Sequence, residues 1–301
     1  MSRTLPRLLA SLVASLVLAL ALARAAPRAS SRLPAHAAPA GSRVRLIVRG
    51  DDMGSSHASN DAALRCFTDG VMRDVEVMAV GPWFPEAARL LRANPGLDVG
   101  LHLALTSEWE NVKWRPLSAA PSLVERGGWF FPMIWPGANY GNERALHEQP
   151  WKLDEIEREL RAQIELAQRE LPQLSHLSDH MGFQGLGPEL PALVRRLAVE
   201  YHVDVDPETL GVRGVGWDGK PATSAEKIAS FARVIDSLVP GTYLFVDHPA
   251  LDTPEMRAIG HVGYEGVAVD RQGVTDAWTS ATVKDVVRRR GVELIGYRDL
   301  R

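Results

Sequence analysis

The stretch from Arg45 to Asn60, RLIVRGDDMGSSHASN, places two adjacent carboxylates at the point where an apolar strand ends. Its run of Leu, Ile and Val is typical of a strand that is buried on both faces. Asp51 and Asp52 follow, and after one methionine comes Gly-Ser-Ser. Adjacent residues of an extended strand point to opposite faces. The two carboxylates can therefore share one site only if the backbone turns directly after the strand.

The rest of the chain alternates short apolar strands with amphipathic helices. Strands are predicted over residues 45–50, 75–80, 97–103, 176–178, 202–206, 242–246 and 292–295. Helices are predicted over residues 60–68, 85–96, 153–170, 190–200 and 224–238, and one or more helices over residues 276–290. This alternation implies a mostly parallel sheet in an α/β fold. Six or seven strand–helix units in about 260 residues favour a (β/α) TIM-like barrel, in a single domain over residues 43–301.

The N-terminal segment has the pattern of a secretory signal peptide. Two arginines precede the apolar run 8–22, and Ala-Arg-Ala at residues 23–25 offers a cleavage site. Residues 1–25 are therefore predicted to direct the protein to a secreted or periplasmic location. The alternative is an uncleaved membrane anchor, for which the run is short compared with the roughly 20 residues of a bilayer span. Residues 26–42 are small and Pro-rich, which predicts a flexible tether.

The charge of the domain disfavours one class of partner. Five of the 34 basic residues and none of the 37 acidic ones lie before residue 43, so the domain carries a net charge of −8 with His neutral. An acidic domain repels phosphate backbones, and no nucleic-acid partner is expected. Cys66 is the single cysteine, so the chain forms no internal disulfide. We expect Cys66 to be a buried apolar residue of a helix.

Carboxylates and histidines follow four of the predicted strands. They are Asp51 and Asp52, His102, Asp179 and His180, and Asp247 and His248. The carboxyl ends of the strands of a barrel converge on one mouth. One Asp with two His is a common ligand set for a catalytic divalent metal that keeps positions open. The alternatives are that a single His is a capping or surface residue, and that the Asp pair caps the following helix.

Five segments resemble the YdjC-like family of carbohydrate deacetylases. VRGDDMGSSHASN is similar to the family's strand ending in Asp-Asp-(Phe/Met)-Gly, and PGLDVGLHLAL to its Gly-(Leu/Ile)-His-Leu segment. SHLSDHMG resembles its (Thr/Ser)-His-x-Asp-Ser-His block, DHPA its Cys-His-Pro-Gly, and GVELIGYRDL its C-terminal strand. The segments follow the family's order from about residue 44 to 300. The resemblance implies a deformed (β/α) barrel and the metal-dependent removal of acetyl groups from N-acetylated sugars.

Carried over residue by residue, the resemblance implies that Asp52, His102 and His180 bind one divalent metal ion. It also implies that Asp51 is the general base and His248 the catalytic acid. On this hypothesis Asp51 takes a proton from the attacking water. His248 protonates the leaving amine, because an amide nitrogen leaves poorly as an anion. Zn and Mg are the metals expected first, and Fe, Mn, Co or Ni also suit these ligand types.

The chain departs from the family pattern at two positions. The family's Asp-Ser-His is Ser178-Asp179-His180 here, so the acid before the histidine has moved by one residue. This puts in doubt the contact that Asp179 would make behind the metal ligands. The family's Cys before the catalytic histidine is Asp247 here. A neighbouring carboxylate is expected to raise the pKa of His248, which favours a protonated acid.

A long loop, residues 106–151, follows the strand that bears His102 and is expected to cover the mouth of the barrel. It contains five of the chain's eight tryptophans. Trp109 and Trp114 are predicted to bind substrate, because the apolar faces of sugar rings stack on aromatic planes. The alternative is a small core within the loop, since a long insert needs its own hydrophobic anchor. Both can apply.

The sequence therefore predicts an exported, metal-dependent hydrolase that removes acetyl groups from N-acetylated sugars or oligosaccharides. One alternative is a metal hydrolase of another amide or ester, such as an O-acetyl group or a peptide. Another is a non-catalytic barrel that binds saccharides. The absence of a G-x-x-x-x-G-K-(S/T) motif disfavours a nucleotide hydrolase. A homodimer is left open, and no stable membrane insertion is expected after cleavage of the signal.

Overall fold

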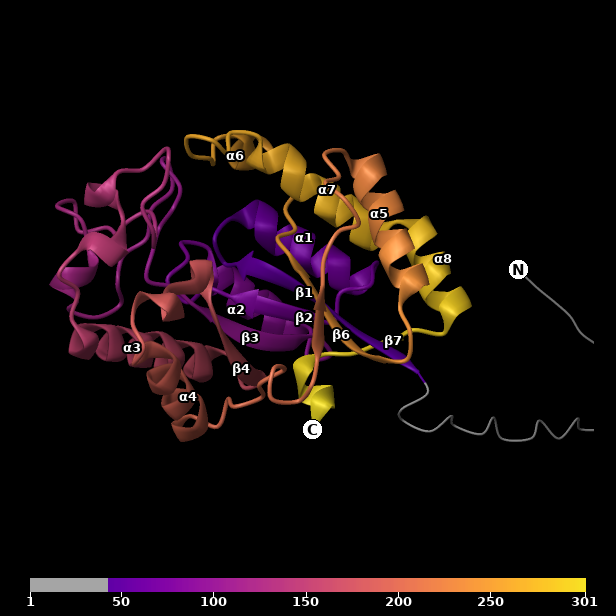
Figure 1. The fold of residues 1–301 in the computed structure, drawn as a ribbon, viewed down its shortest axis with the longest axis horizontal. Coiled ribbons are helices and arrows are strands. Elements are labelled where there is room, and N and C mark those ends of the chain that lie inside the picture. The colour runs from indigo at the N-terminus through magenta and orange to yellow at the C-terminus, as the bar shows by residue number, and fades with distance from the viewer. Residues whose placement is uncertain (1–42) are drawn as a thin grey trace, which may run out of the picture. The chain divides into compact units, whose positions relative to one another are not determined.

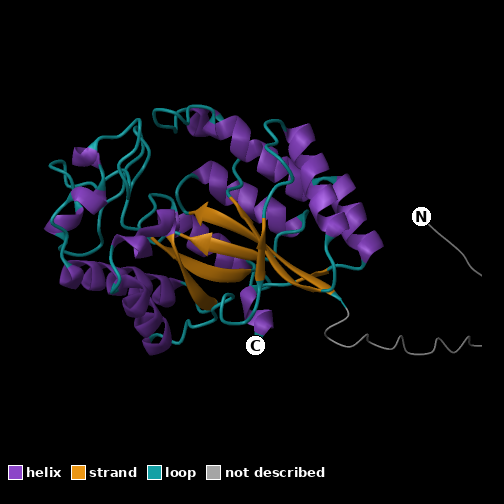
Figure 2. Cartoon of the chain, in the orientation of Figure 1, coloured by secondary structure: helices purple, strands orange, loops and turns teal. Residues whose placement is uncertain are grey.

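Strand β1 (Val44–Met53) lies in the middle of a parallel sheet (Figures 1 and 2). It pairs with β2 (Asp74–Val77) on one side and with β6 (Gly241–Asp247) on the other, and its first half also pairs with β7 (Glu293–Leu294). The order β4-β3-β2-β1-β6-β5 is completed by β3 (Asp98–Leu103), β4 (Leu174–Asp179) and β5 (Arg213–Val215). This computed structural model describes residues 43–301, so the predicted signal peptide (1–25) and tether (26–42) lie outside the described residues.

Helices cover the sheet and complete the strand–helix alternation (Figure 2). They are α1 (His57–Thr68), α2 (Phe84–Ala93), α3 (Leu153–Glu170), α4 (Leu190–Glu200), α5 (Ser224–Ser237), α6 (Pro254–Arg257), α7 (Val267–Thr279) and α8 (Ala281–Arg290). In Figure 1, α5, α7 and α8 lie on the opposite side of the sheet from α3 and α4. Strands β1 to β3 are almost wholly buried between these layers, as expected for a parallel sheet.

The predicted fold class is confirmed, and the barrel is deformed by an opening at one seam. Every pairing between the strands β1 to β7 is parallel, in a single α/β domain. Within residues 43–301, β4 and β5 end the paired path and do not pair with each other. A hollow of about 380 Å³ lies there, lined by β4, by α4 and by the segment 203–209. The barrel is therefore open on the side of β4.

One of the sequence predictions about secondary structure is wrong. Residues 202–206 form no strand, although Val203 and Val205 are buried and alternate with aspartates as in a strand. The helix before them ends with His202 in a left-handed conformation (φ 58°), and the Val203 amide donates back to the carbonyl of Ala198. The next strand is β5, further along. The helical region predicted over 276–290 is confirmed as two helices, α7 and α8, which meet at Ser280; α7 starts nine residues before the predicted region.

Two further expectations concern burial and membrane association. Cys66 is fully buried in α1, as predicted. Burial raises the pKa of its thiol, which leaves it a poor nucleophile. Among residues 43–301, no helix is both long enough and apolar enough to cross a membrane.

Candidate active site at the strand ends

The backbone at Asp52 is what brings the two adjacent carboxylates together. Asp52 has a left-handed conformation (φ 68°), which is uncommon for a residue other than glycine. The register of β1 against β2 shifts between Gly50 and Met53, as at a bulge. Because of this irregularity, the side chains of residues 51 and 52 do not point to opposite faces as they would in a regular strand. Asp51 and Asp52 both come within 4 Å of the Nε2 atom of His102.

The residues after Asp52 hold this turn by hydrogen bonds. Ser55 donates to the Asp52 carbonyl twice, from its amide (3.2 Å) and from its hydroxyl (2.7 Å). The amide of Gly54, at φ 96°, donates to the side chain of Asn60 at 2.7 Å. Ser56 caps the N-terminus of α1 by accepting from the amide of Ser59. The Gly-Ser-Ser segment therefore supplies a turn and a helix cap that fix the position of Asp52.

Asp52, His102 and His180 form a buried cluster suited to a metal ion. Oδ1 of Asp52 lies 3.3 Å from Nδ1 of His180 and 3.7 Å from Nε2 of His102. Ligand atoms about 2.0–2.1 Å from a tetrahedral ion lie about 3.3 Å apart, so the spacing fits one ion. Oδ1 of Asp52 is buried and has no hydrogen-bond partner within the described residues. A cation would satisfy this oxygen, which is otherwise costly to bury.

Each histidine of the cluster uses its second ring nitrogen to contact another side chain. Nδ1 of His102 lies 2.7 Å from the Ser178 hydroxyl, and Nε2 of His180 lies 3.0 Å from Glu108. Such partners fix the ring orientation of metal-binding histidines. Burial lowers the pKa of His102, which favours the neutral form that a metal requires. Burial also lowers the pKa of His180, but the carboxylates of Glu108 and Asp52 outweigh it and raise the value to about 10.

Asp51 lies beside the cluster and is clamped by Arg49. The guanidinium donates to both carboxylate oxygens, from Nε at 2.8 Å and from Nη2 at 2.9 Å. It also donates from Nη1 to the hydroxyl of Tyr297 at 2.9 Å. A forked pair of this kind sets the orientation of the carboxylate as well as its position. Asp51 is therefore held next to the cluster without belonging to it.

His248 approaches the cluster from the end of β6 and is the most accessible of these groups. Its side chain is 37% exposed, and its Nε2 lies 3.8 Å from Oδ2 of Asp52. Burial lowers the pKa of His248, but Asp52 and Asp247 raise it more, so the net shift is upward. The predicted effect of Asp247 is confirmed, although Asp52 contributes more. Asp247 is itself held by the indole of Trp217, which donates to Oδ2 at 2.7 Å.

The structure also shows what Asp179, the displaced acid before His180, contacts. Asp179 accepts a hydrogen bond from the amide of Gln184 at 3.2 Å, and the hydroxyl that meets His102 belongs to Ser178. The side chain that contacts the candidate ligand His102 from behind is therefore Ser178 and not Asp179. Sequence reasoning missed two further contacts of the cluster. Glu108 is in the long loop, and Arg271 of α7 donates to Oδ2 of Asp52 at 2.9 Å.

The burial of Trp109 and Trp114 argues against the platform role predicted for them. Their exposed fractions are 3% and 2%. Trp109 stacks on His261, and the Trp114 indole donates to the Thr106 carbonyl at 2.7 Å. The alternative prediction, a core within the loop, describes this packing. Trp135 of the same loop is 45% exposed instead.

A second buried group of Asp74, Glu76 and His176 lies inside the barrel. Its atoms could in principle hold a metal, but Nη1 of Arg49 lies 3.6 Å from Glu76, and this cation would repel another. Nε2 of His176 lies 2.7 Å from Glu76 and 3.5 Å from Asp74. Burial lowers the pKa of His176, but the two carboxylates raise it to about 10. A protonated His176 therefore supplies the cation of this group.

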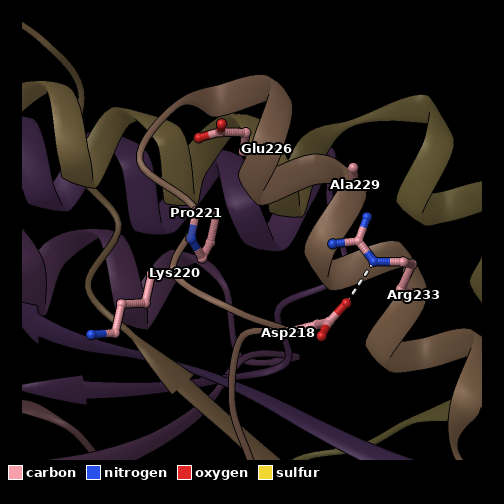
Figure 3. Close-up of a pocket in the computed structure, with 6 residues that line it drawn as sticks. All are labelled: Asp218, Lys220, Pro221, Glu226, Ala229 and Arg233. Carbon is pink, nitrogen blue, oxygen red and sulfur yellow. Dashed lines mark hydrogen bonds and ion pairs between the residues drawn. The ribbon is translucent and has the colours of Figure 1, made fainter.

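A surface hollow of about 230 Å³ lies apart from both groups (Figure 3). It is lined by Asp218, Lys220, Pro221, Glu226, Ala229 and Arg233. Glu226 accepts from the amides of Ala222 and Thr223, as part of the cap of α5. Arg233 is paired with Asp218 at 2.6 Å. These side chains stabilise the start of α5, and we assign the candidate active site to the strand ends.

Three buried side chains that could hold a divalent metal lie at the carboxyl ends of parallel strands, with a carboxylate and a histidine beside them. This arrangement is typical of metal-dependent hydrolases. Comparison with known proteins identifies the family. The model of the YdjC-like protein family matches residues 45–289. The chain belongs to this family.

Relatives in two bacteria align with most of the chain. A carbohydrate deacetylase of Thermus thermophilus is 33% identical over 245 residues, covering 73% of this chain and 82% of the relative. A chitooligosaccharide deacetylase of Proteus mirabilis is 27% identical over 270 residues, covering 85% of this chain and 98% of the relative. A solved structure from Enterococcus faecalis, of a protein proposed to cleave cellobiose phosphate, has a TM-score of 0.65. It is 22% identical and covers 86% of this chain and 99% of its own, which shows a shared fold.

The protonated state of His176 makes the stability of the protein depend on pH. Its folded pKa of about 10 lies above the ordinary 6.5, so its contribution is complete below 6.5 and is lost as the pH rises toward 10. Between about pH 8 and 9.5, the wild type should lose stability relative to His176→Gln by up to about 1.4 kcal/mol per pH unit. Urea unfolding of both proteins, with a chelator present, measures this. Parallel stability curves over that range would contradict a protonated His176.

Proposed function

We propose that the protein is a metal-dependent carbohydrate deacetylase that removes acetyl groups from N-acetylated sugars or oligosaccharides. The observation that carries this proposal is that two further groups contact the cluster of Asp52, His102 and His180. Oδ2 of Asp51 lies 3.8 Å from Nε2 of His102, and Nε2 of His248 lies 3.8 Å from Oδ2 of Asp52. A hydrolase of an amide needs a base for water, an acid for the amine and stabilisation of the oxyanion. Asp51 and His248 can supply the base and the acid, and the cluster of Asp52, His102 and His180 can hold a metal that stabilises the oxyanion.

The metal would be held by Asp52, His102 and His180. When bound, it would polarise the acetyl carbonyl and lower the pKa of water in the site. His102 is suited to this role because burial favours its neutral form. His180 would release a proton on binding the metal, since Glu108 and Asp52 raise its pKa to about 10. The ligand types leave the identity of the metal open among Zn, Mg, Mn, Fe, Co and Ni.

Asp51 is assigned as the base that accepts the proton of the attacking water. Both of its oxygens accept from Arg49, and each oxygen keeps a further lone pair for a water molecule. Its Oδ2 lies 3.8 Å from Nε2 of His102, which is one of the three candidate metal ligands. Arg49 is in turn held by Tyr297, so the base is oriented before substrate arrives.

His248 is assigned as the acid that protonates the leaving amine. Its raised pKa, due to Asp52 and Asp247 acting against burial, favours the protonated form that an acid needs. Its side chain is the exposed one of the site, so a leaving group can reach it. The adjacent Asp247 takes the place of a cysteine in the family pattern. The indole of Trp217 holds this carboxylate in position for the histidine.

A carbohydrate substrate is supported by the family and by the names of the two relatives. The sequence predicts that the long loop contacts sugar through Trp109 and Trp114, which are buried. We assign this contact to Trp135 of the same loop instead. This ring is exposed and lies against Gly185, in the 3₁₀ segment that begins with His180. Export to a secreted or periplasmic location stays a prediction from residues 1–25. The hydrolysis of an O-acetyl ester or a peptide by the same groups is the alternative.

Acetate release tests the proposed activity. The purified domain should release acetate from N-acetylglucosamine oligomers, and a chelator should abolish it. Added divalent metal should restore it, and the metal that restores most activity is then identified. Release from O-acetyl esters alone would favour the alternative substrate class. No acetate from either class, in protein shown to carry metal, would contradict a deacetylase.

The acid role of His248 predicts a split between amide and activated ester substrates. An aryl oxide leaves without protonation, whereas an amine does not. His248→Ala should therefore lose about 10²–10⁴-fold in kcat/KM on an N-acetyl amide and much less on 4-nitrophenyl acetate. Asp51→Asn should lose activity on both substrates, because both need an attacking water. His57→Ala, which removes an exposed histidine outside the site, is the matched control. Equal losses on both substrates in His248→Ala would contradict the acid assignment.

A further inference from the structure

Arg271 is the one cationic residue of helix α7, and it contacts Asp52, one of the three candidate metal ligands. The residue is buried, with an exposed fraction of 5%, and its Nη2 donates to Oδ2 of Asp52 at 2.9 Å. The two residues are 219 positions apart in the chain. Burying a guanidinium is costly unless it is paired, so a contact of this kind needs a specific reason.

The two oxygens of Asp52 have different surroundings. Oδ2 accepts from Arg271, whereas Oδ1 faces both histidines and has no hydrogen-bond partner within the described residues. A carboxylate can bind a metal through one oxygen or through both. If both oxygens bound, the ion would have one position fewer for water and for the substrate carbonyl. The structure distinguishes the two oxygens before any metal binds.

The surroundings of Arg271 fix the direction of its side chain. The guanidinium carbon lies 5.1 Å from the centre of the Trp109 ring. The backbone of Arg271 is held by Thr275, whose hydroxyl donates to its carbonyl, and by the amide of Ala250, which follows the loop of His248. Trp109, predicted to contact sugar, instead supports this guanidinium. With these contacts on its ring side and its backbone, Arg271 directs Nη2 to Oδ2 of Asp52.

We propose that Arg271 is a positioning residue that reserves Oδ2 of Asp52 and leaves Oδ1 alone to bind the metal. This inference rests on the proposed function, because it assumes that Asp52, His102 and His180 hold a metal. Arg271 thereby keeps coordination positions open for the reaction. Its own charge opposes that of the metal, so it favours an open site at the expense of metal affinity.

Substitution of Arg271 tests this through the coordination of Co²⁺, measured apart from activity. In Arg271→Gln, Asp52 is free to bind through both oxygens, and the visible absorption of bound Co²⁺ should weaken as its coordination number rises. Calorimetry should show Co²⁺ affinity equal to or greater than that of the wild type. The kcat for acetate release should fall by about 10–100-fold. Arg271→Lys, which keeps a donor for Oδ2, should retain the wild-type spectrum and most of the activity.

Arg161→Gln is the control for loss of a guanidinium–carboxylate contact. Arg161 pairs with Glu157 and Glu200 on the surface of α3 and α4, away from the cluster. The visible absorption of Co²⁺ bound to Arg161→Gln, and the activity of this variant, should match those of the wild type. A wild-type Co²⁺ spectrum in Arg271→Gln would overturn the inference, as would loss of Co²⁺ binding in that variant while it remains folded. Failure of the wild type to bind Co²⁺ or any other divalent metal would overturn the proposed function itself, and the inference with it.

Discussion

The left-handed turn at Asp52 is the constraint on which the site depends. A regular strand would send Asp51 and Asp52 to opposite faces. The turn and the bulge bring both to His102, where one can hold a metal and the other can act on water. A strained conformation of this kind persists only where its surroundings fix it. Here the hydrogen bonds of Ser55 and the contact of Gly54 with Asn60 provide that support.

The carboxylates are also placed by cations from distant parts of the chain. Arg49 clamps Asp51 from within β1, and Arg271 reaches Asp52 from α7. Elsewhere in the barrel interior, a protonated His176 balances Asp74 and Glu76. The interior of this barrel is therefore partly ionic. Each charge orients a neighbour, and truncating one member would leave the others unpaired. We infer that such pairing is what keeps Asp51 and Asp52 in separate roles.

Sequence reasoning found the residues at the strand ends and missed those that support them. Asp51, Asp52, His102, His180 and His248 follow apolar runs, and the topology of a parallel sheet brings such positions together. Glu108 and Arg271 lie in a loop and in a helix whose approach depends on tertiary packing, so no local pattern marks them. The alternation at 202–206 resembled a strand because Val203 and Val205 are buried, yet no neighbouring strand pairs with them. Burial explains the pattern without a sheet.

Diffraction from crystals soaked with Zn²⁺ or Co²⁺, at the absorption edge of the metal, tests the central claim most directly. The account predicts one strong anomalous peak about 2.0–2.2 Å from Oδ1 of Asp52, Nε2 of His102 and Nδ1 of His180. It also predicts that Asp51 remains paired with Arg49 and outside the coordination sphere. A peak bound by Asp51 in place of Asp52, or a peak at Asp74, Glu76 and His176 with none at the strand ends, would contradict the account.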